Sequence, residues 1–401
     1  MERSRLRKHE MEQTHVPAST DTRMKIAVVC YPTYGGSGVV ATELGMGLAQ
    51  KGHEVHFVSS SQPARLDLLN ERVHYHEVAM LHYPVFEHSP YLLALTGKLV
   101  DVVRHEGIEL VHVHYAIPHA TAALLARDIL QHEGIRLAVV TTLHGTDVTL
   151  VGKDPGYEPV VSHAINLSDG VTAVSESLRR DTLEHFHVEK PIQVIPNFID
   201  LERFKQRNPC RFTLALAGEN QKRLIHISNF RKVKRVDSVI RVFALIREKI
   251  SACLLLVGDG PERPRCEQLC RELGIAADVR FLGKQEAVEE ILSAGDLFLL
   301  PSETESFGLA ALEALACGVP VVSSRSGGLP EVNVDGVTGF LTDADDVQGM
   351  AQAAMRLLHD DALLQAFRLA ARRQAERFAI HRILPLYEEA YHRALQAVRV
   401  H

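Results

Sequence analysis

Two glutamates in the stretch from Pro301 to Leu315 have a spacing that suits a long polar ligand. Glu305 lies in a polar loop after an apolar run, and Glu313 follows in an Ala- and Leu-rich segment, with seven residues between them. If one helix runs through both, their carboxylates lie about 12 Å apart, because a helix rises about 1.5 Å per residue. The N–H groups of Ser306 to Ala310 would then mark a helix start, where an anion is stabilised. The spacing predicts a binding site for an elongated phosphate-bearing molecule. A surface-loop glutamate and an unrelated glutamate on an amphipathic helix would account for the same spacing equally well.

A basic loop follows an expected strand at Leu224 to Ser228. It begins at Asn229 and holds four basic residues in the five positions from Arg231 to Arg235. A solvated loop is the default interpretation of such a charge run. A position at a strand end facing Glu305 instead suggests a pyrophosphate clamp, in which Arg231 and Lys234 supply the charge.

Three histidines of the first half lie within or directly after expected strands. His144 comes after the apolar run Leu137 to Thr142 and opens the sequence His-Gly-Thr-Asp. Ligands of open α/β sheets lie beyond the carboxyl ends of the strands, which favours a functional His144 over a structural one. His112 and His114 alternate within a strand, where a metal site competes with two half-buried, hydrogen-bonded histidines, the interpretation we prefer.

A glycine-rich turn follows the first expected strand, Lys25 to Cys30. Its sequence from Gly36 to Ala41 matches the G-x-G-x-x-A fingerprint of dinucleotide-binding proteins. The fingerprint needs an acid after the second strand, where this chain has Ser59 to Ser61, so NAD binding is not expected. The glycines still allow close approach to a ligand, and Ser37 offers a hydroxyl and an N–H to an anion.

Strand and helix patterns alternate along the chain from Lys25 onward, which predicts an α/β protein built from two arrays of parallel strands with helices on both faces. We place the domain junction in the polar segment 201–222. The expected divisions are a domain over 24–200, a second over 201–380, and a helix over 381–401 that crosses back onto the first domain, with Pro385 at the bend. Residues 1–23 are charged, lack the apolar core of a signal peptide and are expected to be a disordered extension.

Composition indicates a soluble, cytoplasmic protein. The chain has 401 residues, of which 46% are hydrophobic and 23% charged, with a net charge of −6. The negative charge argues against nucleic-acid binding, and no apolar run reaches the ~20 residues of a membrane helix. The six cysteines are scattered, as in proteins of a reducing compartment.

The motif around Glu305 and Glu313 resembles the E-x7-E motif of the retaining glycosyltransferases of family 4, which have the GT-B fold. The flanking sequences Gly258 to Glu262 (GDGPE) and Gly327 to Glu331 (GGLPE) agree with it, and the resemblance covers nearly the whole chain from Met24. It implies two Rossmann-like domains with a cleft between them, a nucleotide-sugar in the second domain and an acceptor in the first.

The resemblance implies roles for individual residues. Glu313 would hold the ribose, Glu305 the donor sugar and Lys234 the phosphates, while His144 would face the anomeric carbon. The family loop usually carries an arginine where this chain has Asn229, so Arg231 is expected to supply that charge. The full donor set is Gly38, Asn229, Arg231, Lys234, Gly258, Glu305, Ser306, Phe307, Gly308, Leu309 and Glu313, with His144, Arg231, Lys234 and Glu305 as catalytic residues.

A narrower resemblance is to a subfamily that transfers N-acetylglucosamine from UDP-GlcNAc to L-malate, the first step of bacillithiol synthesis. It is carried by the segments 31–40 (YPTYGGSGVV), 144–149 (HGTDVT), 196–198 (PNF) and 228–231 (SNFR). The acceptor set it implies is Gly36, Ser37, Tyr115, Thr146, Lys153 and Asn197.

The implied partners are therefore UDP-GlcNAc and L-malate, with no nucleic acid and no membrane insertion. No D-x-D motif lies between strands to carry Mg²⁺, so we expect no cofactor and no essential metal. The oligomeric state stays open, a homodimer included. Competing hypotheses are a family 4 enzyme with another acceptor, a GT-B UDP-GlcNAc 2-epimerase or phosphorylase, and a non-catalytic sugar-nucleotide-binding regulator.

Overall fold

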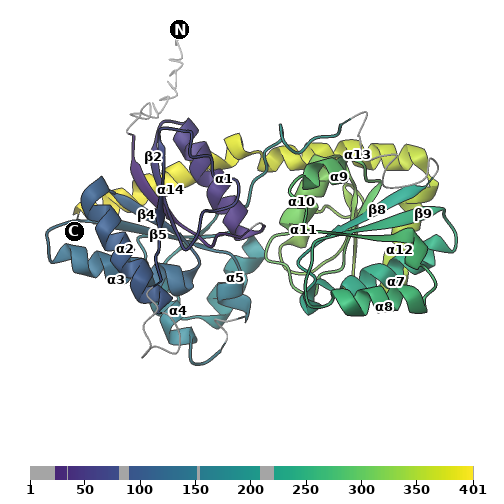
Figure 1. Ribbon diagram of the computed structural model, residues 1–401, viewed down its shortest axis with the longest axis horizontal. Helices are drawn as coiled ribbons and strands as arrows, with labels where there is room; N and C mark the ends of the chain where they lie inside the picture. Colours follow the sequence, from purple (N-terminus) through teal and green to yellow (C-terminus); the bar gives the residue numbers. More distant parts are fainter. Residues whose placement is uncertain (1–22, 34, 81–89, 151–153, 208–220, 401) are drawn as a thin grey trace, which may run out of the picture.

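The computed structural model describes residues 23–33, 35–80, 90–150, 154–207 and 221–400. Two parallel β-sheets form the centres of two α/β units that lie side by side (Figure 1). The segment 1–23, which is expected to be disordered, lies outside the described residues except for its last residue. The α/β fold with two parallel sheets is as predicted.

The first sheet has seven strands in the order β3-β2-β1-β4-β5-β6-β7. The strands are β1 (Lys25–Val29), β2 (Glu54–Ser59), β3 (Val73–Glu77), β4 (Leu110–His114), β5 (Ala138–Leu143), β6 (Gly170–Ala173) and β7 (Ile192–Val194). The central strands are nearly continuous apolar runs because helices bury both faces of the sheet.

Helices of the first unit divide between the two faces. Side chains of α1 (Ser37–Gln50) and α14 (Ile380–Val400) pack on one face, and those of α2 (Tyr91–Glu106), α3 (Thr121–Gln131) and α4 (Glu158–Leu167) on the other. The helix α5 (Glu176–His185) packs against β6 and β7.

The second sheet has six strands in the order β10-β9-β8-β11-β12-β13. The strands are β8 (Lys222–Ile227), β9 (Ala252–Val257), β10 (Val279–Gly283), β11 (Leu297–Leu300), β12 (Val321–Ser324) and β13 (Gly339–Thr342). The helices of this unit are α7 (Val236–Arg247), α8 (Arg263–Glu272), α9 (Val288–Ser293), α10 (Leu309–Ala316), α11 (Leu329–Val332), α12 (Val347–His359) and α13 (Asp361–Ala375). A short 3-10 turn, η3 (Lys232–Lys234), lies between β8 and α7.

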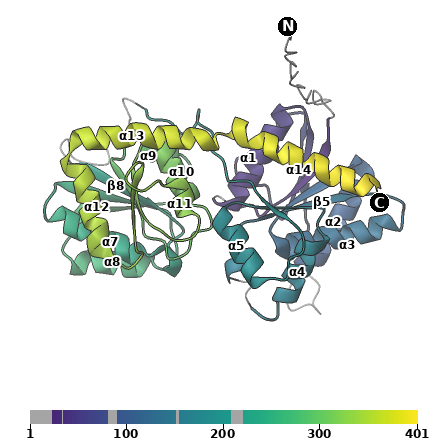
Figure 2. The same ribbon diagram turned by 180° about the vertical axis from the view of Figure 1, so that it is seen from behind.

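The C-terminal segment returns to the first unit. In Figures 1 and 2 the yellow helices α13 and α14 run along the second and the first unit in turn. The helical run is interrupted at Ala379, whose backbone is extended, and Ile380 donates a hydrogen bond from its N–H to the carbonyl of Ile199. Pro385 lies inside α14, so the prediction that it marks the bend is wrong.

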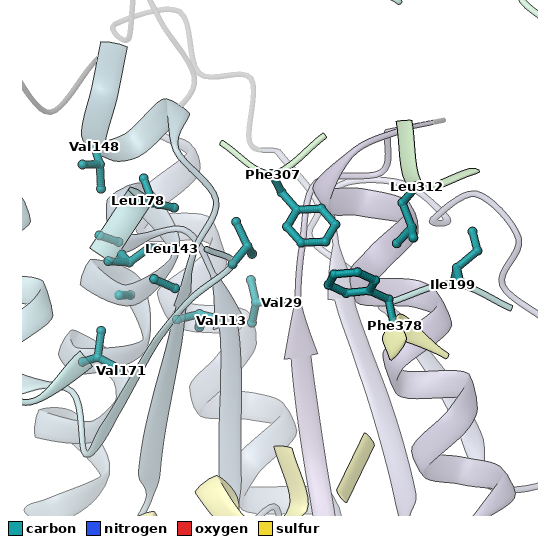
Figure 3. Packing of buried hydrophobic residues seen from close by; sticks show 14 of the residues in the cluster. Val29, Val113, Leu143, Val148, Val171, Leu178, Ile199, Phe307, Leu312 and Phe378 are labelled. Carbon is teal, nitrogen blue, oxygen red and sulfur yellow. The ribbon is translucent and has the colours of Figure 1, made fainter. Parts of the chain in front are cut away.

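The two units share a continuous hydrophobic cluster. Figure 3 shows Phe307 of the second unit facing Phe378 of the returning segment, with Leu312 and Ile199 beside them. The two phenyl rings are edge to face with centroids 5.7 Å apart, a favourable geometry for aromatic pairs. This packing fixes the loop that follows β11 against the crossing between the units.

Glu305 lies in a loop and Glu313 in a helix, as expected, and no helix runs through both. The helix α10 begins only at Leu309, and Gly308 before it has a positive φ of 101°. The left-handed backbone at Gly308 separates the Glu305 loop from the helix, so the expected spacing of about 12 Å along one helix does not apply. The sequence patterns also did not predict β3 and β13, each of which is one of the two edge strands of its sheet.

Candidate active site

A cavity of about 240 Å³ lies between the carboxyl ends of the two sheets. Both units contribute to its walls, as expected for open α/β sheets that face one another. The lining residues from the first unit are Gly36, Ser37, Tyr115, His144, Thr146, Thr149, Val174 and Asn197. The second unit contributes Asn229, Arg231, Val233, Lys234, Thr304, Glu305, Ser306, Phe307, Gly308 and Leu309.

An ion pair dominates the second-unit wall. The Lys234 ammonium donates to Oε2 of Glu305 over 2.6 Å, and both side chains are about four-fifths buried, with 20% and 18% of their side-chain surface exposed. A neighbouring backbone hydrogen bond, from Glu303 N–H to the Val233 carbonyl, holds the two loops together. The pair places a cation and an acid next to each other at the edge of the cavity, as the basic loop and Glu305 were expected to be.

A buried histidine supports the basic loop from below. His226 on β8 is hydrogen-bonded through Nδ1 to the Leu299 carbonyl and through Nε2 to Oγ of Ser228, at 2.9 and 2.7 Å. Burial lowers the pKa of His226 to about 4, so the ring is neutral at physiological pH. The Ser228 hydroxyl in turn accepts the Phe230 N–H over 3.3 Å, which orients the start of the loop.

Glycines allow other loops to pack closely against these two. A Cβ atom on Gly258 would lie 1.8 Å from the Ser228 carbonyl oxygen, and one on Gly327 would lie 1.9 Å from that of Glu305. Both glycines also have positive φ values, which L side chains rarely adopt. The GDG and GGLPE sequences thus act as backbone supports for the loops that carry Asn229 and Glu305.

Paired histidines form the first-unit wall. Nδ1 of His114 and Nε2 of His144 share a hydrogen bond of 2.7 Å, and the two rings are stacked with centroids 5.0 Å apart. Burial lowers the pKa of His144 to about 3, and that of His114 also falls well below its ordinary value. His144 therefore faces the cavity as a neutral imidazole that can exchange hydrogen bonds but carries no charge.

His112 is held away from the cavity. It is hydrogen-bonded to the Thr142 hydroxyl through Nε2 and to the Tyr391 hydroxyl through Nδ1, at 2.7 and 2.8 Å. With both ring nitrogens engaged, His112 is a buried, hydrogen-bonded histidine, fully rather than half buried. Its contacts agree with the preferred interpretation and not with a metal ligand.

Asp147 organises the two loops that hold the histidine wall. Its buried carboxylate accepts the N–H of Ala116 over 2.9 Å and that of Gly145 over 3.0 Å. Burial raises the pKa of Asp147, while these backbone hydrogen bonds oppose the shift. Asp147 was not among the predicted site residues, although the sequence His-Gly-Thr-Asp contains it.

Ser37 and Tyr115 form a polar contact at the start of α1. Their hydroxyl groups are hydrogen-bonded over 2.6 Å, and Tyr115 has a positive φ of 90°, an unfavourable conformation for a non-glycine residue. No side chain among the described residues caps the N-terminus of α1. The first N–H groups of this helix are therefore oriented toward the cavity side and can bind an anion.

Most of the predicted residues meet in this one cavity, while a few do not line it. Gly38 is buried within α1, where a Cβ atom would lie 2.4 Å from the Thr33 hydroxyl. Gly258 acts through the loop beneath Asn229, and Lys153 lies outside the described residues. Their predicted contacts with substrates stay predictions.

Glu313 lies on α10 and is not among the residues that line the cavity. Burial raises its pKa to about 7, with Arg65 and Arg203 lowering it and Glu43 raising it. These three residues come from outside the α10 element, and the Glu43 carboxylate contacts the Arg65 guanidinium. The predicted ribose contact of Glu313 is not tested by this geometry.

Four residues of the cavity were missed by the sequence patterns: Thr149, Val174, Val233 and Thr304. Thr149, Val233 and Thr304 lie within a few residues of a predicted site residue, whereas Val174 follows β6 and is distant in the chain from all of them. A rule that extended each motif to its neighbours would have included the first three, but no residue-type signal marked Val174.

No helix among the described residues is long and apolar enough to span a membrane. The five described cysteines are buried, and none of them forms a disulfide.

Two family models match the chain. The model described as Glycosyltransferase Family 4 matches residues 34–203, and the model described as Glycosyl transferases group 1 matches residues 215–374. Each match covers one of the two α/β units.

Curated relatives are similar over most of their length. N-acetyl-alpha-D-glucosaminyl L-malate synthase of Bacillus anthracis is 46% identical over 376 residues, which cover 93% of this chain and 98% of that protein. D-inositol 3-phosphate glycosyltransferase of Rhodococcus opacus is 32% identical and matches 71% of this chain and 68% of its own length.

Solved structures share the fold. Sucrose-phosphate synthase from Thermosynechococcus elongatus superposes with a TM-score of 0.78 at 21% identity, covering 94% of this chain and 100% of that chain. Anabaena HepE in complex with UDP and glucose superposes with a TM-score of 0.77 at 22% identity, covering 92% and 99%. The chain therefore belongs to the glycosyltransferases that combine a family 4 domain with a group 1 domain, and it has the GT-B fold.

Proposed function

We propose that this protein is a retaining glycosyltransferase that moves N-acetylglucosamine from UDP-GlcNAc to the hydroxyl group of L-malate, as the first step of bacillithiol synthesis. The observation that carries the proposal is the 46% identity, over 98% of the relative's length, to an N-acetyl-alpha-D-glucosaminyl L-malate synthase. The cavity between the two units supports it, because its walls offer groups suited to a sugar diphosphate on one side and a small dianion on the other.

The donor diphosphate is assigned to the second-unit wall. In the free protein Lys234 is paired with Glu305, so the ammonium already lies at the edge of the cavity in a fixed position. On donor binding we expect Lys234 and the exposed Arg231 to contact the phosphates, while Glu305 accepts hydrogen bonds from the sugar hydroxyls. The two negative charges of a bound diphosphate are then balanced by the Lys234 ammonium and the Arg231 guanidinium.

Bond cleavage places negative charge on the β-phosphate. The bond between the anomeric carbon and the UDP oxygen breaks, and Lys234 and Arg231 stabilise the charge that develops on the departing oxygen. The malate hydroxyl attacks from the face that UDP leaves, and its proton passes to the departing phosphate. Neutral His144 serves as a hydrogen-bonding partner at the sugar. We propose that this chemistry needs no metal ion and no cofactor.

The acceptor is assigned to the first-unit wall. One malate carboxylate is expected at the start of α1, where the uncapped N–H groups and the Ser37 hydroxyl bind an anion. Asn197 lines the same cavity, and its Oδ1 is buried without a hydrogen-bond partner among the described residues. An unpaired buried acceptor of this kind is satisfied by a donor such as the malate hydroxyl. Thr146 is the remaining neighbour, and Lys153 is retained as a predicted second contact.

The test is a transfer assay with purified protein, UDP-GlcNAc and candidate acceptors, read by mass spectrometry. We expect L-malate to be glycosylated well and a simple hexose not to be, with mono-acid analogues of malate intermediate. Ser37→Ala should raise the KM for malate more than the KM for UDP-GlcNAc. Equal turnover of hexose and malate would refute the malate assignment and leave a glycosyltransferase with another acceptor.

We also propose a cytoplasmic location. The described cysteines support it, because none of them forms a disulfide and disulfides are rare in reducing compartments.

A further inference from the structure

A cluster of histidines and carboxylates lies far from the cavity, at the opposite end of the first sheet. His56 on β2 pairs in register with His74 on the edge strand β3. Glu54 precedes His56 by two residues, so all three side chains point to the same face of the sheet. The cavity lies beyond the carboxyl ends of these strands, whereas Glu54 begins β2. Nothing in the proposed reaction uses this cluster.

The ligand atoms of the cluster are spaced for one metal ion. Nε2 of His56 lies 3.1 Å from Oε1 of Glu54, and Nε2 of His74 lies 3.8 Å from the same oxygen. Two ligands of a tetrahedral zinc ion, each about 2.0–2.1 Å from the metal, lie about 3.3 Å apart. The three atoms therefore need only small shifts to surround an ion.

The geometry points to a binding site for a zinc-class divalent ion, held by Glu54, His56 and His74, that ties the edge strand β3 to β2. Two imidazoles and a carboxylate are the ligand set that suits zinc and neighbouring transition metals, not Mg²⁺ or Ca²⁺. Glu54 and His74 have 32% and 41% of their side-chain surface exposed, so an ion can enter from solvent and keep a water ligand.

His76 supplies the outer contact that a metal-bound histidine needs. The ring of His56 is fully buried, and its Nδ1 lies 2.9 Å from Nε2 of His76. When Nε2 of His56 binds a metal, its Nδ1 carries the proton and donates to His76, which fixes the ring. Burial also lowers the pKa of His56 to about 4, which keeps the imidazole neutral at physiological pH.

Lys25 competes with an ion for the same carboxylate. Its ammonium lies 3.2 Å from Oε1 of Glu54, but its side chain is 43% exposed and also donates to the Glu106 carbonyl. The lysine can therefore move away when an ion binds. A second ligand set, His56, His76 and Glu106, shares His56 with the first and is the alternative location.

The test is a titration of the chelator-stripped full chain with Zn²⁺ against a chromophoric chelator, repeated with Co²⁺ to read tetrahedral coordination by visible absorption. We expect one equivalent to bind. His74→Ala should weaken binding more than about 100-fold, and His76→Phe by about 10–100-fold. Lys25→Met should strengthen it by about threefold to tenfold, because a competing cation is removed.

Two variants act as matched controls. His105→Ala removes an exposed histidine of α2 that pairs with Asp101, and it should leave the affinity unchanged. Glu106→Gln disables the alternative ligand set and should also leave it unchanged. Zn²⁺ should raise the Tm of the wild type by a few degrees and that of His74→Ala by less.

Failure to bind one equivalent would overturn the proposal, as would unchanged affinity in His74→Ala. Loss of binding in Glu106→Gln with retention in His74→Ala would overturn the assignment to Glu54 and His74. Transfer activity in EDTA is a separate readout, and its loss would contradict the metal-free mechanism rather than this site.

Discussion

Lys234 is the residue whose charge is best placed to act on the departing phosphate. It is four-fifths buried against Glu305 at the edge of the cavity, so its field is less screened than that of an exposed lysine. Lys234→Ala should lower kcat by about 10²–10³, the range found when one group that stabilises a developing charge is removed.

Lys232 offers a matched control for this prediction, because it lies in the same turn but is exposed. Lys232→Ala should change kcat by less than about threefold. Steady-state kinetics separate the effects: a Lys234→Ala enzyme with a raised KM and an intact kcat would show that the lysine only helps binding.

Glu313 links binding to pH through its buried carboxyl group. Its pKa is about 7 in the folded chain, above its ordinary value of 4.5, so the folded state holds the proton more tightly than the unfolded state. The free energy of unfolding should therefore fall as pH rises from about 4.5 to about 7. At pH 8 the ionised carboxylate is destabilising, and Glu313→Gln should unfold with a free energy about 1–3 kcal/mol higher than the wild type.

Urea denaturation at pH 5 and pH 8 measures this difference, which should nearly vanish at pH 5. Glu272→Gln, an exposed substitution on α8, is the control and should show no difference at either pH. The same Glu313→Gln variant should lose about 1–3 kcal/mol of UDP affinity if the carboxylate accepts the ribose hydroxyls. Unchanged UDP affinity by calorimetry would refute the ribose role and leave the stability prediction intact.

The residue patterns and the resemblance to family 4 glycosyltransferases together predicted much of the site. His144, Lys234 and Glu305 each follow an apolar run that was expected to be a buried strand, and strand ends meet at one edge of a parallel sheet. The roles given to Lys234 and Glu305 came from the resemblance. The sequence suggested that the basic loop faces Glu305, but it could not show that Lys234 pairs with Glu305 or that His114 contacts His144, because these partners are about 70 and 30 residues apart in the chain. Asp147 was missed because it accepts hydrogen bonds from backbone N–H groups, and such contacts produce no pattern of residue types in the sequence.

At the scale of elements, the loop after β5 packs closely against the loop after β11, and Gly145 is the residue that allows this contact. A Cβ atom on Gly145 would lie 1.7 Å from Oγ of Ser306, and Gly145 also has a positive φ of 113°. Gly145→Ala should push the two loops apart, displace His144 from the cavity and lower kcat/KM by more than about 100-fold.

Gly52→Ala is the control for this prediction, because it introduces a similar backbone strain without a steric clash. Gly52 has a similar φ of 101°, but its nearest neighbour, Nε of Arg23, would lie 3.8 Å from the added Cβ. Both substitutions should destabilise the fold by about 1–2 kcal/mol, and only Gly145→Ala should lose activity. The double variant Gly145→Ala and Ser306→Gly should recover part of the activity; equal losses in Gly145→Ala and Gly52→Ala would contradict the clash.

The distance between Glu305 and Glu313 shows what the sequence pattern left open at the level of elements. An Ala- and Leu-rich run extends back to Leu309, and no residue type forbids a further turn of helix before it. Gly308 takes a left-handed backbone because the loop must follow Phe307, which packs against Phe378 across the crossing segment (Figure 3). Tertiary packing therefore set the start of α10, as it also set the edge strands β3 and β13.

At the scale of the whole molecule, the alternation of strands and helices predicted two parallel sheets. It could not predict which residues join the two α/β units. The structure joins the two units at the start of α5. The Glu331 carboxylate accepts the N–H groups of Glu176 and Ser177, each over 2.9 Å, and the Ser175 hydroxyl donates to the Ser306 carbonyl over 2.6 Å. A carboxylate at a helix N-terminus is favourable both as an acceptor and as a charge.

Glu331→Ala should therefore open the molecule. Hydrogen bonds to a charged group contribute about 1.5–3 kcal/mol, so their loss should shift the free protein toward separated units. We expect a larger radius of gyration by small-angle X-ray scattering, which saturating UDP together with malate should partly reverse, because ligands bound on both walls of the cavity favour the closed form. Glu272→Ala removes an exposed carboxylate of the same unit and should leave the radius unchanged. A Glu331→Ala protein with the wild-type radius and wild-type kcat/KM would show that the remaining contacts, the Ser175–Ser306 hydrogen bond and the packing of Phe307 on Phe378, are enough to hold the units together.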